Sequence, residues 1–173
     1  SLLQTPQEVL ALVEVLELEY TPEVLKEQFT IVLDGIQDPG NMGTILRIAD
    51  WFGIRNIVCS LQTVDCYNPK VVQATMGSIA RVNIVYKDLK SILKDQNSLS
   101  FGGFMDGENI YEMDLPKKGI LVLGNEANGI QHDVESLIAT RVAIPRFGDV
   151  QETESLNVAN AASILLSEFR RRY

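Results

Sequence analysis

Three polar segments hold the residues whose types and spacing could do chemistry: residues 34–43, 124–129 and 145–157. Each combines glycine with asparagine or a carboxylate, and each follows an apolar run typical of a buried strand. In open α/β sheets, ligands bind beyond the carboxyl ends of the strands. The three segments together therefore predict one composite ligand site. Taken singly, each could equally be a turn whose glycines supply positive φ.

Several familiar sites are excluded or disfavoured by the residues themselves. Gly35 and Gly40 have the outer spacing of a phosphate-binding loop, but Asn41 occupies the position where that motif needs lysine. The dinucleotide fingerprint G-x-G-x-x-G and the nucleophile elbow G-x-S-x-G are both absent. His132, the one histidine, is most simply a surface residue at a helix start. Two cysteines and one histidine exclude a multi-cysteine zinc cage, and we expect no metal.

Length and composition are those of one folded domain. The chain has 173 residues, of which 46% are hydrophobic and 22% charged. No apolar run approaches the roughly 20 residues that span a bilayer, so we expect no membrane partner. The net charge is −8, and residues 1–35 carry six of these negative charges, so charge neither supports nor excludes RNA as a partner. Cys59 and Cys66 are expected to stay reduced in a cytoplasmic protein, Cys59 as a buried thiol on a strand.

Strand-like and helix-like runs alternate along the chain. A capping box at residues 5–8 predicts a helix start, whereas residues 9–15 could be helix or strand. Predicted strands cover residues 30–34, 56–60, 82–86, 98–105, 119–124 and 141–145. Predicted helices cover residues 41–52, 69–76, 88–93, 133–138 and 155–171, the last with Ser155 near its cap. This alternation predicts an α/β fold with a parallel sheet and helices on both faces.

Taken together and in order, these segments resemble the SpoU (TrmH) family of RNA ribose methyltransferases, in the SPOUT superfamily. The first motif of that family is N-x-G-x-x-x-R, to which Asn41, Gly43 and Arg47 correspond, and Glu126 is similar to the acidic member of its second. The matching stretches are residues 41–47, 68–77, 123–129, 144–148 and 155–158. The resemblance covers about residues 28–171, although the loop between Gly148 and Ser155 is longer than is usual in the family.

The resemblance implies a C-terminal deep trefoil knot that binds S-adenosylmethionine in a bent shape. By position, Leu123, Gly124, Ile144 and Leu156 would contact this methyl donor, and Thr75 could contribute. For the apolar members, core packing is the simpler alternative. A bulky side chain at Gly124 should abolish donor binding by occupying the space that the ligand needs.

The implied reaction is methyl transfer to a ribose 2′-hydroxyl of ribosomal RNA; the alternatives are transfer RNA and a non-catalytic RNA- or nucleotide-binding module. Asn41, Arg47, Glu126 and Asn157 correspond to family residues that line the catalytic site. Family proposals make Arg47 the general base, but a guanidinium keeps its proton to a pKa above ~12, so phosphate binding or charge stabilisation is the safer role. Glu126 could orient Arg47 or Asn41, and Asn157 could hold the hydroxyl or Glu126. The simpler reading of Arg47 is a surface pair with Asp50.

Two expectations concern assembly and extent. Residues 156–166 are apolar almost all round the predicted helix, and the family forms dimers through the knot with sites completed across the interface, so we expect a homodimer. Residues 1–27 resemble a linker and first strand that follow a small RNA-binding domain, with the methyltransferase domain at residues 28–173. The chain is therefore expected to be a fragment that lacks that RNA-binding domain.

Overall fold

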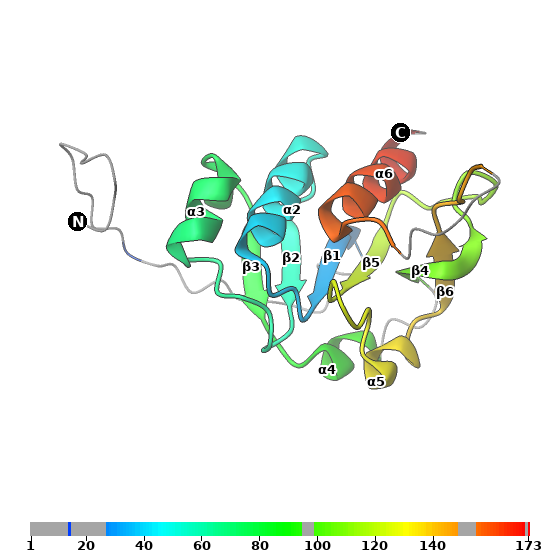
Figure 1. Cartoon of the computed structure of the whole chain (residues 1–173), viewed down its shortest axis with the longest axis horizontal. Helices are drawn as coiled ribbons and strands as arrows, with labels where there is room; N and C mark the ends of the chain where they lie inside the picture. Colours follow the sequence, from blue (N-terminus) through cyan, green and yellow to red (C-terminus); the bar gives the residue numbers. More distant parts are fainter. Residues whose placement is uncertain (1–13, 15–26, 95–98, 149–154, 172) are drawn as a thin grey trace.

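Six parallel strands form the sheet of this protein. The structure is a computed structural model that describes residues 14, 27–94, 99–148, 155–171 and 173, so the helix start predicted at residues 5–8 lies outside the described residues. The strands are β1 (Phe29–Asp34), β2 (Asn56–Cys59), β3 (Asn83–Tyr86), β4 (Ser100–Asn109), β5 (Gly119–Gly124) and β6 (Thr140–Ala143). Their order is β3-β2-β1-β5-β4-β6, and every neighbouring pair is parallel (Figure 1). The predicted parallel sheet is confirmed.

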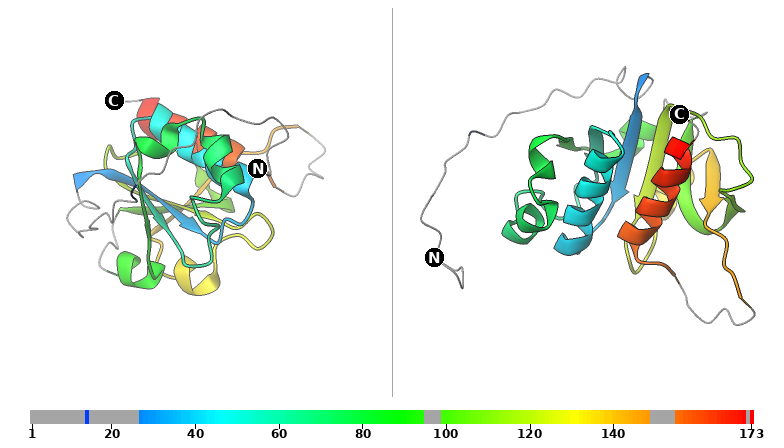
Figure 2. Two further views of the ribbon diagram at one scale, coloured as in Figure 1. Left: turned by 90° about the vertical axis from the view of Figure 1, so that its left-hand side faces the viewer. Right: turned by 90° about the horizontal axis from the view of Figure 1, so that it is seen from above.

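Helices cover both faces of the sheet, as predicted. They are α2 (Pro39–Trp51), α3 (Pro69–Thr75), the 3-10 helix η1 (Ser78–Ala80), α4 (Leu89–Leu93), α5 (His132–Glu135) and α6 (Val158–Arg171). Helices α3, α2 and α6 lie side by side over one face, while α4 and α5 lie against the other (Figures 1 and 2). Among the described residues, no helix has the length and apolar character needed to cross a membrane.

The fully buried strand β1 explains why the core has two halves. Alternate side chains of a strand point to opposite faces. Ile31 and Leu33 join a buried cluster with residues of α2 and α6, whereas Val32 joins a second cluster with Leu93 of α4 and Val134 of α5. All six residues of β1 are buried, as they are in a central strand of a parallel sheet.

Side-chain caps place two helix starts away from their predicted positions. Helix α2 begins at Pro39 rather than Asn41 because Asp38 is the N-cap and its Oδ1 accepts from the Asn41 N–H at 2.7 Å. Helix α6 begins at Val158 because Asn157 Oδ1 accepts from Ala159 N–H at 3.0 Å and Asn160 N–H at 3.3 Å. The cap predicted near Ser155 is therefore wrong by two residues.

Strand β4 extends to Asn109, beyond the predicted end at residue 105. Its second half pairs with β6 after a register shift between Gly103 and Glu108. A bulge of this kind interrupts the simple alternation of buried and exposed residues. The break in the sequence pattern at residue 105 therefore marks the bulge, and the strand continues beyond it.

The glycine of the N-x-G motif is explained by packing between helices. A Cβ placed on Gly43 would lie 2.4 Å from the Ala74 Cβ and 2.8 Å from the Val71 carbonyl oxygen. Helices α2 and α3 therefore approach one another too closely for any side chain at position 43.

Candidate active site

The three polar segments meet at one open depression beyond the carboxyl ends of the strands. Its volume is about 580 Å³, and it is lined by Gln37, Asp38, Asn41, Asn125, Glu126, Ala127 and Asn157. The first three residues come from the β1–α2 segment and the start of α2, the next three come from the β5–α5 loop, and Asn157 directly precedes α6. Sequence reasoning did not single out Gln37 or Asn125, although both fall inside the polar segments 34–43 and 124–129.

A directed chain of hydrogen bonds joins one residue from each segment. Asn157 Nδ2 donates to Asn41 Oδ1 at 2.9 Å, and Asn41 Nδ2 donates to Glu126 Oε1 at 2.8 Å. The direction is set by the helix cap, because Asn157 Oδ1 already accepts from backbone N–H groups of α6. Glu126 accepts the last hydrogen bond of this chain through Oε1. The structure thus brings together three of the four residues assigned a catalytic role.

The start of α2 holds Asn41 in place for this contact. Asp38 bonds the Asn41 N–H, and Pro39 occupies the first turn, where its missing N–H costs nothing. Gly40 lies close to that cap, since a Cβ there would be 3.0 Å from Asp38 Oδ1. The Asp-Pro-Gly-Asn run is thus a helix start that presents the Asn41 amide to the depression.

Asn125 organises the β5–α5 loop. Its backbone exchanges two hydrogen bonds with Gly129, each 2.9 Å, and its Oδ1 accepts from Ala127 N–H at 2.9 Å and Asn128 N–H at 3.1 Å. Its Nδ2 donates to the Gly35 carbonyl at 2.7 Å. An asparagine that bonds to the backbone two residues ahead is a known turn signal, and it could have identified this residue from the sequence.

Gly124 is required by the backbone of its own loop. A Cβ at this position would lie 2.2 Å from both Gly129 C and Ile130 N. This differs from the reason expected from the sequence, which was space for a ligand. Any side chain at position 124 must displace residues 129–130 before it meets a ligand.

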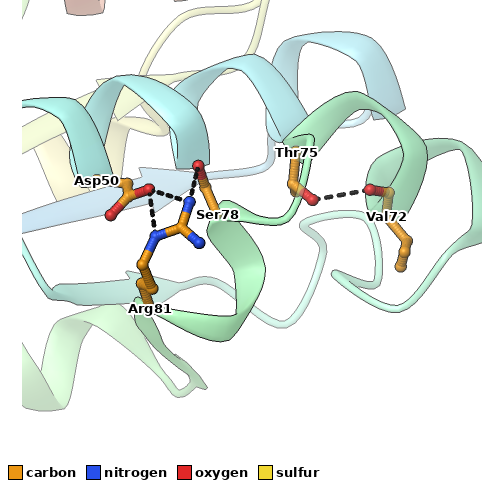
Figure 3. Close-up of polar contacts among 5 residues, drawn as sticks. All are labelled: Asp50, Val72, Thr75, Ser78 and Arg81. Atoms are coloured by element: carbon orange, nitrogen blue, oxygen red, sulfur yellow. Dashed lines mark hydrogen bonds and ion pairs between the residues drawn. The ribbon is translucent and has the colours of Figure 1, made fainter.

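The remaining residues assigned to donor binding divide into two groups. Leu123 is the last residue but one of β5, with 2% of its surface exposed. Ile144 is partly buried just after β6, and Leu156 is 50% exposed just before α6. These three lie at the same edge as the depression. Thr75 does not: it is fully buried in α3, on the far side of α2 from α6 (Figures 1 and 2). Its hydroxyl donates to the Val72 carbonyl at 2.7 Å (Figure 3).

Arg47 does not line the depression of its own chain. It lies six residues after Asn41, which at about 100° per residue turns the two side chains to different sides of α2. It is exposed and does not line the depression. The alternative of a surface pair with Asp50 is not what the structure shows, because Asp50 Oδ2 accepts two hydrogen bonds from Arg81 at 2.9 and 2.7 Å (Figure 3). Hydrogen bonding to Arg81 lowers the pKa of Asp50.

Within the described ranges, no group of three or more His, Cys, Asp or Glu side chains is placed to hold a metal ion. His132 is exposed at the first position of α5, as expected from the sequence. The lack of a metal requirement stays a prediction.

Comparisons with known proteins agree with the motifs. Residues 28–167 match the sequence model of the SpoU rRNA Methylase family. The 23S rRNA (guanosine(2553)-2′-O)-methyltransferase RlmP of Bacillus subtilis is 29% identical over 171 residues, which cover 96% of this chain and 66% of that protein.

Two solved structures are similar in fold and sequence. A TrmH-family protein from Porphyromonas gingivalis superposes with a TM-score of 0.79 at 47% identity, over 85% of this chain and 61% of that one. The AdoMet-bound rRNA methyltransferase of Sinorhizobium meliloti superposes with a TM-score of 0.76 at 30% identity, over 84% and 57%. The chain thus spans less than two thirds of the length of each of these proteins. The family match covers most of the chain, and the chain belongs to the SpoU rRNA methylase family.

Proposed function

We propose that this chain transfers a methyl group from S-adenosylmethionine to a ribose 2′-hydroxyl of ribosomal RNA. The observation that carries the proposal is the hydrogen-bonded chain Asn157–Asn41–Glu126, which joins all three family motifs at one depression. The similarity to RlmP and to an AdoMet-bound rRNA methyltransferase supports the same substrate and the same donor.

The depression suits a ligand that is partly polar and partly apolar. Its volume of about 580 Å³ lies within the range of about 300–1,000 Å³ that is common for ligand sites. Leu156 is 50% exposed and Ile144 is partly buried; neither lines the depression, but both supply apolar surface at the same edge of the sheet. We propose that these two residues and the backbone around Leu123 and Gly124 hold the donor, which supplies the methyl group.

The polar residues have separate tasks in this proposal. The ribose oxygen gains the methyl group and loses its proton, so the hydroxyl must be held in line and its developing charge stabilised. Asn157 holds the hydroxyl, and Glu126 orients Asn41. Arg47 binds RNA phosphate or the developing charge, because a guanidinium does not readily accept a proton.

The direct test is transfer of a labelled methyl group to bulk ribosomal or bulk transfer RNA. We expect label in ribosomal RNA, and an unchanged rate when a chelator is added, because no residue of the proposed site needs a metal. Label in transfer RNA alone would overturn the ribosomal assignment. Binding of S-adenosylmethionine without transfer to either RNA would favour a non-catalytic binding module.

We further propose that the site is completed in a homodimer. Arg47 is exposed and does not line the depression of its own chain, which supports a role in the site of a second copy. Ala161 and Ile164 of α6 are only partly buried, which leaves apolar surface for such a contact. Light scattering at tens of micromolar should give the mass of a dimer, and the mass of a monomer would contradict this prediction.

Subunit mixing tests whether Arg47 acts across the interface. Arg47→Ala and Asn41→Ala should each be inactive alone. A heterodimer of the two has one site with both residues intact if the site is shared, so an equimolar mixture should recover about a quarter of wild-type activity. No recovery would place both residues in the site of one chain.

The trefoil knot also remains part of the proposal. The chain leaves β6 at one edge of the sheet and returns to α6, which packs beside α2.

A cytoplasmic location is likewise proposed. Cys59 and Cys66 are free and buried, and burial raises the pKa of both thiols. Protonated, buried thiols of this kind suit a reducing compartment.

A further inference from the structure

Asp34 is a buried carboxylate at the end of β1 that none of the assigned roles uses. Only 1% of its surface is exposed. Both of its oxygens are bonded to one residue on the far side of the β5–α5 loop: Oδ2 accepts from the Gln131 N–H at 2.8 Å, and Oδ1 accepts from Gln131 Nε2 at 2.9 Å. Gln131 is the residue that precedes α5. The end of the loop is therefore fastened to the end of β1.

The start of the same loop is hydrogen-bonded to Gly35, the residue that follows Asp34. Asn125 Nδ2 donates to the Gly35 carbonyl at 2.7 Å, and the Gly35 N–H donates to Ser60 Oγ at 2.9 Å. Glu126 lies between the two attachment points of the loop. The position of Glu126 relative to Asn41 thus depends on how the loop is held on Asp34 and Gly35.

A buried carboxylate is a costly way to hold a loop. Desolvation by burial raises the pKa of Asp34, and nearby Asp133 raises it further, whereas the hydrogen bonds from Gln131 and a weaker contribution from Ser60 lower it. Among the ion pairs of the described residues, none includes Asp34. A carboxylate buried without a cation depends on hydrogen bonds to offset its lost hydration, and Gln131 donates two of them to Asp34.

We propose that Asp34 is a positioning residue, which through its two hydrogen bonds to Gln131 holds the β5–α5 loop in the geometry that binds the methyl donor and presents Glu126 to Asn41. This inference rests on the proposed function of that loop.

The test is a charge exchange between the two partners. Gln131→Glu places two carboxylates face to face, and we expect calorimetry to show S-adenosylmethionine binding weakened by about tenfold or more. Adding Asp34→Asn should restore the dissociation constant to within about threefold. The amide introduced at position 34 can accept a hydrogen bond from the backbone N–H of residue 131. It can also donate one to the carboxylate introduced at position 131.

A matched control is Asp50→Asn, which removes a hydrogen-bonded carboxylate from the same fold away from the loop. It should leave donor binding unchanged. If Gln131→Glu lowers the melting temperature but binds the donor like wild type, the contact is merely structural and the proposal fails. Failure of the double variant to recover binding also overturns it.

Hydrogen exchange separates this inference from the proposed function. The N–H groups of Ala127 and Asn128 are bonded within the loop and report its order. They should lose protection in Gln131→Glu and regain it in the double variant, even if wild type binds no S-adenosylmethionine. Unchanged protection in Gln131→Glu would overturn the positioning role whatever the ligand is.

Discussion

Arg47→Ala should lower the single-turnover rate of methyl transfer at least ~100-fold and leave the affinity for S-adenosylmethionine nearly unchanged. The reason is that the proposed donor residues come from the ends of β5 and β6 and the start of α6, whereas Arg47 lies on α2 and is assigned to the RNA side of the reaction. It is exposed, and its expected partner Asp50 is bonded to Arg81 instead. Loss of Arg47 should therefore change neither the fold nor the affinity for S-adenosylmethionine.

Two variants sharpen this prediction. Arg47→Lys should recover little activity, because an ammonium cannot reproduce the planar, forked contacts of a guanidinium. Arg55→Ala is the matched control, since Arg55 is also exposed but lies just before β2, at the opposite ends of the strands. A rate for Arg47→Ala within threefold of wild type, on any RNA that wild type accepts, would show that Arg47 is an ordinary surface residue.

Gly124→Ala and Gly124→Val should both abolish donor binding, for which we expect a micromolar dissociation constant in wild type, near −8 kcal/mol. The first added carbon already lies 2.2 Å from the backbone of Gly129 and Ile130. The loop must move to accept it, and the contact of Glu126 with Asn41 moves with the loop. Calorimetric titration with S-adenosylmethionine measures the loss, and thermal unfolding shows whether the variants remain folded.

Comparing Gly124→Ala with Gly124→Val distinguishes the two possible causes of lost donor binding. A collision with the loop affects alanine and valine alike, whereas competition for ligand space affects valine far more. Normal binding by Gly124→Ala with loss in Gly124→Val would therefore support the ligand-space explanation. Gly53→Ala is the control for loss of a glycine, because φ is +67° there and nothing lies within 4 Å of an added Cβ. It should bind the donor normally despite some loss of stability.

The sheet and most of its helices follow from short-range patterns. The run Gly119–Gly124 is apolar at every position between its glycines, and the structure makes it a strand with the predicted bounds. Such runs are buried on both faces in a parallel sheet, so the pattern alone identifies them. The pattern is less informative at helix starts, where the polar group that satisfies the free N–H groups sets the boundary. Asp38 and Asn157 do this, and neither was predicted as a cap.

The parallel α/β fold and the three polar segments follow from sequence patterns, and the residues to consider follow from the resemblance of those segments to a family. Which of these residues touch depends on the tertiary fold. The contacts of Asn41 with Glu126 and Asn157 span 85 and 116 residues of chain, and that of Asp34 with Gln131 spans 97. Such contacts depend on the strand order, which places β5 beside β1, and local propensity carries no information about that order. For the same reason Asp50 bonds to Arg81 and not to Arg47 on its own helix, and Gly124 is required by a backbone that folds back over it.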